Sequence, residues 1–81
     1  MLKHFVIELS TDGDLDLDVF NTKEEATTFI NDRANEIHDQ LLEESSAYDL
    51  DLIIHHTYAR VSVVKHGCEF ERILEYKTLD V

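Results

Sequence analysis

Cysteine, glycine and basic residues are scarce in this chain, and each shortage excludes a class of protein. The lone cysteine, Cys68, rules out an intramolecular disulfide. With only two glycines the chain has no Gly-rich phosphate-binding loop, and it carries no nucleophile-elbow or zinc-protease motif. It contains neither an apolar run near the roughly 18 residues of a membrane-spanning helix nor a charged-then-apolar leader. We therefore expect a soluble, cytoplasmic protein that is not an enzyme and binds no cofactor.

The shortage of bases gives the chain a strong and uneven negative charge. It has 7 Lys and Arg against 18 Asp and Glu, a formal charge of −11. From Glu8 to Asp51 there are 14 acids and 2 bases, whereas the rest of the chain is nearly neutral. This field disfavours direct binding to nucleic acid and to anionic membranes, and it attracts a basic protein partner.

Apolar residues are present in sufficient number for one core. The 81 residues are 43% hydrophobic. We expect a single domain over residues 1–81 that folds with a thin stability margin and without a disulfide or a metal.

The clearest element is a helix predicted over Thr22–Glu44. Thr22 and Glu25 have the spacing of a capping box, in which the threonine hydroxyl accepts from the Glu25 amide. No glycine or proline interrupts the stretch, and its apolar residues follow the period of a helix with one buried stripe. These apolar residues are Ala26, Phe29, Ile30, Ala34, Ile37 and Leu41.

An acidic stripe runs along the same helix. It consists of Glu25, Asp32, Glu36, Asp39 and Glu43. At about 100° per residue these acids share a sector roughly 60° wide, and at about 1.5 Å per residue the stripe is about 27 Å long. Like charges four residues apart, such as Asp32 and Glu36, cost the helix a few tenths of a kcal/mol. We interpret the stripe either as a solvated face that maintains solubility or as an anionic recognition surface.

Arg33 disagrees with its position, because it lies near the centre of the apolar arc of the helix. An arginine in such a place usually extends along the edge of the core and pairs with an acid. We expect this arrangement for Arg33, in preference to the alternative that it faces a partner through a gap in the sheet.

Two alternating segments joined by Asp12-Gly13 predict a β-hairpin before the helix, with strands at Leu2–Leu9 and Asp14–Phe20. The second strand has two faces, one with Leu15, Leu17 and Val19 and the other with Asp14, Asp16 and Asp18. We expect the leucine face to lie beneath the helix and the three aspartates to form a row on the open side of the sheet.

The chain after the helix is rich in β-branched residues. A polar loop at 44–47 leads to an apolar segment at Leu50–Ile54, and Tyr58–Lys65 is a strand. The periodicity of Glu69–Thr78 fits a strand or a helix, and the turn at Gly67 favours a strand in a hairpin. The predicted fold class is α+β. It is a small two-layer domain with an antiparallel sheet ordered β-β-α-β-β, with or without an extra short strand at Leu50–Ile54, and the helix packed on one face.

Two groups of residues resemble metal ligands, and neither fits. With Asp14 counted as position one, ligand positions of an EF-hand loop are occupied by Asp16, Asp18, Thr22 and Glu25, but Val19 stands where that loop needs glycine. The histidines at 55, 56 and 66 and Cys68 lack the recurrent ligand spacing of a zinc site. We therefore predict no metal site.

Two functions are favoured by these observations, and a small metal- or ligand-binding domain is a third alternative. The first is a non-enzymatic interaction protein whose acidic surface imitates nucleic-acid phosphates and occupies the basic groove of a nucleic-acid-handling protein. The analogy with small acidic inhibitors from phages and mobile elements is one of charge and size, not of a matched motif. The partner-binding residues would be the helix stripe together with Asp14, Asp16 and Asp18. The second is a structural or regulatory protein, homodimeric through a C-terminal edge strand such as Tyr58–Lys65, whose acidity only maintains solubility.

Overall fold

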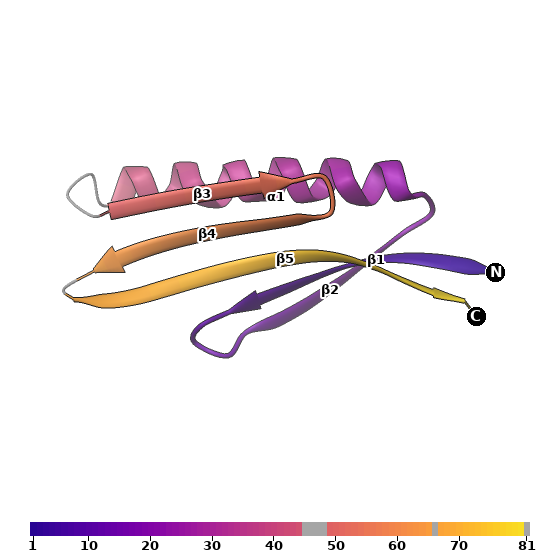
Figure 1. Ribbon diagram of the computed structural model, residues 1–81, viewed down its shortest axis with the longest axis horizontal. Coiled ribbons are helices and arrows are strands. Elements are labelled where there is room, and N and C mark those ends of the chain that lie inside the picture. The colour runs from indigo at the N-terminus through magenta and orange to yellow at the C-terminus, as the bar shows by residue number, and fades with distance from the viewer. Residues whose placement is uncertain (45–48, 66, 81) are drawn as a thin grey trace.

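Five antiparallel strands form one sheet and one helix packs on a face of it, within residues 1–44, 49–65 and 67–80 that the computed structural model describes (Figure 1). The elements are β1 Leu2–Ser10, β2 Leu15–Phe20, α1 Lys23–Glu44, β3 Asp49–His55, β4 Tyr58–Lys65 and β5 Cys68–Asp80. The strand order across the sheet is β2-β1-β5-β4-β3. The predicted α+β fold is confirmed, and the segment at Leu50–Ile54 belongs to a full strand. Beyond Glu44, the predicted loop at 44–47 lies outside the described residues.

The helix begins where the capping signal predicts. The Glu25 amide donates to the Thr22 hydroxyl at 3.1 Å, which satisfies one of the free amides of the first turn. The buried stripe of α1 consists of Ala26, Ile30, Ala34 and Ile37. Because two of these four residues are alanines, the helix can approach the sheet closely, and it lies along β3 and β4 (Figure 1).

The core between helix and sheet contains mostly small and medium apolar side chains. The sheet contributes Val6, Ala59, Val61 and Leu74, all at most 1% exposed. At the edge of this core, Phe20 of β2 meets Phe29 of α1 with ring centroids 5.2 Å apart. The centre of the core therefore lies over β1, β5 and β4, and β2 reaches it only through its last residue.

The leucine face of β2 is on the open side of the sheet, so the prediction that it lies beneath the helix is wrong. β1 and β2 pair with Val6 opposite Asp18 and with Glu8 opposite Asp16. Paired residues of antiparallel strands point to the same side, and Val6 is buried under the helix. Asp16 and Asp18 therefore point to the helix side, not to the open side. The other side chains of β2 point away from the helix and are exposed, namely Leu15, Leu17 and Val19.

The exposure of the leucine face of β2 on the open side of the sheet has a physical cause. Alternation along a strand indicates the core only where another layer covers that strand. β2 is an edge strand, and the helix lies along the opposite edge of the sheet, over β3 and β4 (Figure 1). In β1, the face that turns toward the helix is the one on which Glu8 meets Arg33.

The C-terminal half of the chain forms much of the inner sheet. β5 is a strand throughout Glu69–Thr78, as the turn at Gly67 predicts, and Gly67 has the positive φ of 79° that favours glycine. β5 pairs with β1 and β4, and β4 pairs with β5 and β3. Tyr58–Lys65 is therefore an inner strand without a free edge, and the edges of the sheet are β2 and β3.

The buried stripe of α1 gives a first test. Replacing Ile37, which is 4% exposed, with alanine should lower the free energy of unfolding by about 2–5 kcal/mol, because it leaves a cavity beneath the helix. Leu42→Ala on the same helix is the matched control, since Leu42 is 45% exposed and its truncation should cost far less. Denaturant melts measure both variants. Equal midpoints would show that α1 buries a different face.

Candidate functional site

The five carboxylates of the helix stripe all lie on the solvent-exposed surface of α1. Glu36 accepts a hydrogen bond from Arg33 at 3.0 Å, and Asp39 lies 3.7 Å from Nδ1 of His38. Glu25, Asp32 and Glu43 have no ion-pair partner within the described part of the chain. The stripe therefore presents negative charge that is only partly neutralised from within the molecule.

Two of the three predicted aspartates lie on the same side of the molecule as the stripe. Asp16 and Asp18 project from β2 toward the side of the sheet that carries the helix. Asp14 instead precedes β2, in the turn, where its amide donates to the Ser10 hydroxyl at 3.2 Å. The structure thus brings the strand and helix acids to one side. We call this set the acidic surface, which comprises Asp16, Asp18, Glu25, Asp32, Glu36, Asp39 and Glu43.

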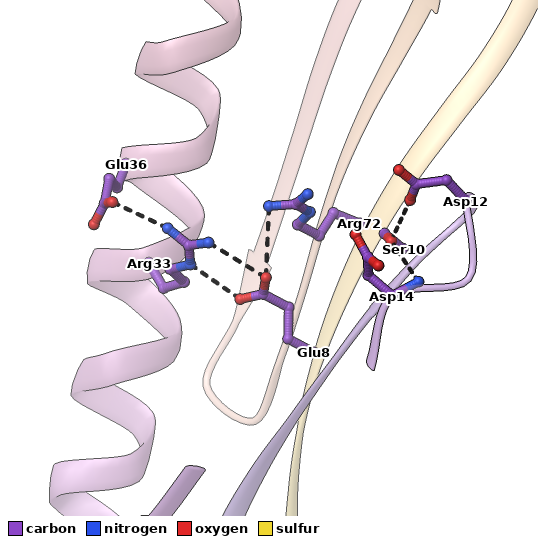
Figure 2. Close-up of polar contacts among 7 residues, drawn as sticks. All are labelled: Glu8, Ser10, Asp12, Asp14, Arg33, Glu36 and Arg72. Atoms are coloured by element: carbon purple, nitrogen blue, oxygen red, sulfur yellow. Dashed lines mark hydrogen bonds and ion pairs between the residues drawn. The ribbon is translucent and has the colours of Figure 1, made fainter. Parts of the chain in front are cut away.

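A buried carboxylate that the sequence reasoning missed lies between the strand and helix parts of this side. Glu8 is 6% exposed, and its Oε1 accepts from Arg33 Nε at 3.0 Å (Figure 2). Its Oε2 lies 3.6 Å from Nη1 of Arg72. The hydrogen bond to Glu8 raises the pKa of the Arg33 guanidinium above its ordinary value. The expectation that Arg33 pairs with an acid is confirmed, and Arg33 was the only signal that could have led to Glu8.

Three bases on the helix side are held by internal partners. Arg33 donates to Glu8 and to Glu36, and Arg72 forms an ion pair with Glu8. Nζ of Lys23 lies 5.7 Å from the centroid of the Tyr76 ring, which is a cation–π distance. These three cations are therefore held close to the sheet by their partners. They do not lie between the exposed carboxylates along the helix stripe.

A hollow of about 380 Å³ opens beside the ionic network. Its apolar lining comes from the second half of α1 and from β4 and β5, and consists of Ile37, Leu41, Val61, Val63 and Phe70. Its polar lining consists of Ser10, Thr11, Asp12, Gln40, Glu71 and Arg72. Small-molecule sites usually have volumes of roughly 300–1,000 Å³, so the hollow is large enough for an apolar side chain or a small apolar group.

The turn between β1 and β2 forms one wall of this hollow and is fixed by side-chain contacts. The Ser10 hydroxyl donates to the Asp12 carboxylate (Figure 2). This bond lowers the pKa of the Asp12 carboxyl below its ordinary value. Thr11 ties the turn to β5, because its amide donates to the Glu71 carbonyl at 3.0 Å and its hydroxyl accepts from the Glu71 amide at 2.6 Å.

Comparison of the chain with models of protein families, with curated proteins and with solved structures gives no match in any of the three. Within residues 1–44, 49–65 and 67–80, no helix is both long and apolar enough to cross a bilayer. The same residues contain no group of three or more His, Cys, Asp or Glu side chains placed to hold a metal ion, and His66 lies outside them.

The ionic network predicts a stability effect that depends on which partners are removed. Arg33→Met should lower the free energy of unfolding by about 1–3 kcal/mol, because buried Glu8 loses its nearest hydrogen-bond donor. The double variant Glu8→Leu/Arg33→Met should recover most of this loss, since apolar side chains often replace a buried ion pair without a penalty. Arg72, about one-third exposed, then turns to solvent. Urea melts measure both variants, and a double variant less stable than Arg33→Met would contradict the expectation.

Proposed function

We propose that this protein is a non-enzymatic inhibitor whose acidic surface occupies the basic, nucleic-acid-binding groove of a partner protein. The observation that carries the proposal is the gathering of strand and helix acids on one side of the molecule. The nearest arginines are held by Glu8 and do not neutralise the outward stripe, apart from the bond to Glu36. A helix selected for stability alone would have bases among these acids, because like charges four residues apart oppose helix formation.

The linear charge density of the stripe indicates which phosphates it resembles. Its five carboxylates span about 27 Å, so one charge occurs about every 7 Å. Duplex DNA has one charge per about 1.7 Å of axis, and each strand has one per about 3.4 Å. The stripe therefore has about half the charge density of one strand, and Asp16 and Asp18 add a second short row with a spacing of about 7 Å. This density favours imitation of a single row of phosphates over imitation of a whole duplex.

The hollow supports the proposal because it supplies an apolar contact beside the charges. Specific interfaces combine an apolar centre with a polar rim, and complementary charge mainly sets association rate and specificity. Phe70 lines the hollow and is 44% exposed, so an apolar side chain of the partner can be buried against it. Gln40, which also lines the hollow, is the next residue of α1 after Asp39 of the stripe.

Neutralising part of the stripe tests the proposal against a matched control. The stripe variant is Asp32→Asn/Asp39→Asn/Glu43→Gln, and it leaves Glu36 in place because Glu36 holds Arg33. The control variant is Asp49→Asn/Asp51→Asn/Glu69→Gln, at exposed positions outside the acidic surface. Each variant removes three negative charges and changes the formal charge from −11 to −8. Any difference between them therefore reports where the charge lies, not how much there is.

The measurement is capture of a partner from cell lysate over a salt series, followed by a nucleic-acid-binding assay of the captured protein. Wild type and control variant should retain the same basic protein, release it as salt screens the charges, and block its binding to nucleic acid. The stripe variant should release this basic protein at a lower salt concentration and should no longer block its binding to nucleic acid. The proposal fails if both variants behave alike, or if the captured protein binds nucleic acid equally well with the chain bound.

A further inference from the structure

The open face of the sheet has a contiguous apolar patch that no element of the described chain covers. It is a ladder of pairs between β1 and β2, with Phe5 opposite Val19, Ile7 opposite Leu17, and Leu9 opposite Leu15. The exposed fractions of Leu9, Leu15, Leu17 and Val19 are 47, 64, 59 and 57%. We call these six residues the open-face ladder. Contiguous patches of this kind on a soluble protein usually mark an interaction site.

The charges around the ladder differ from those of the helix side. Its charged neighbours on β1 and β5 are Lys3, Glu75 and Lys77, and Nζ of Lys77 lies 3.4 Å from Oε2 of Glu75. The acids of β2 point to the opposite side of the strand. The negative charge of the chain is therefore not concentrated at the ladder, and a surface of the same composition can approach it without strong repulsion.

We infer that the open-face ladder is a dimerisation surface and that it packs against the same ladder of a second copy of this chain. Face-to-face sheets commonly pack about 10 Å apart with their strands within about 30° of each other. A two-fold axis makes such a contact self-complementary. In this arrangement both helices, with their acidic surfaces, lie on the outer sides of the dimer, where repulsion between the copies is weakest. The inference is independent of the proposed function, which concerns the other face.

The size of the open face is consistent with a reversible dimer. The five strands contain 6 to 13 residues, so at about 3.3 Å per residue and about 4.8 Å between strands the whole open face covers roughly 700 Å² per copy. β1 and β2, which carry the ladder, supply about one-third of it, and the part over β3 and β4 carries Asp49, Asp51 and Arg60. Twice the whole area is near the lower limit of specific interfaces, which bury about 1,200–2,000 Å². Pairing through the free edge of β2 is a poorer alternative, because it would place Asp16 and Asp18 of one copy beside those of the other.

Sedimentation velocity over a concentration series tests the inference. The ladder variant is Leu15→Ser/Leu17→Ser, and the matched control is Asp16→Ser/Asp18→Ser, which changes the same strand on its opposite face. Wild type should change from monomer to dimer as concentration rises. The ladder variant should associate more than about tenfold more weakly, and the control should dimerise at least as strongly as wild type.

The ladder leucines are exposed in the single chain, so the ladder variant should keep the native circular dichroism spectrum. Methyl NMR spectra of wild type give a second readout that needs no variant. On dilution the signals of Leu15 and Leu17 should shift, whereas that of buried Leu74 should not. The inference is overturned by a wild type that stays monomeric, by a folded ladder variant that dimerises like wild type, or by dilution shifts confined to the helix side. Equal weakening by both variants also overturns it, because that result indicates pairing through the edge of β2.

Discussion

The helix covers the face of the sheet that carries Val6, Val61 and Leu74, with Glu8 of β1 and Arg33 of α1 paired on the same face, and the rest of the structure depends on this constraint. A buried ion pair adds little net stability, but turning the sheet over would leave Arg33 beside apolar side chains and without its acid. Side chains alternate along a strand, so placing Glu8 beneath the helix also places Val6 there and turns Ile7 and Leu9 outward. Because β1 pairs with β2, the side chains of the edge strand follow the same alternation between the two faces of the sheet.

The edge strand β2 consequently contributes to two different surfaces. One of its faces adds Asp16 and Asp18 to the acidic surface, and the other adds Leu15 and Leu17 to the open-face ladder. Most half-buried strands have one face in the core and one in water, whereas β2 has both faces exposed except at Phe20. β2 therefore separates its two aspartates from its exposed leucines, which lie on opposite faces of the sheet.

Local signals in the sequence predicted the elements well, and non-local information determined their faces. The cap at Thr22 and the periodicity of the residues after it predicted α1, and the β-branched run at Tyr58–Lys65 predicted β4 with the bounds that the structure has. The strand order could not be predicted, because it depends on pairing between β1 and β5 at opposite ends of the chain. Without that order, β2 could not be recognised as an edge strand. Similarly, the position of Arg33 predicted that it pairs with an acid, but not with which one. Glu8 lies 25 residues away in the sequence, and only the fold brings it to Arg33.

The assignment of the two faces is tested most directly by nuclear Overhauser effects between methyl groups. If α1 covers the face that carries Glu8, the methyls of Ile30 should show effects to core residues of the sheet, among them Val6 and Leu74. The methyls of Leu17 should show none to any residue of α1, because they lie on the opposite face. Effects between Leu17 and Ile30 would contradict the account, since they would place the leucine face beneath the helix and Glu8 away from Arg33.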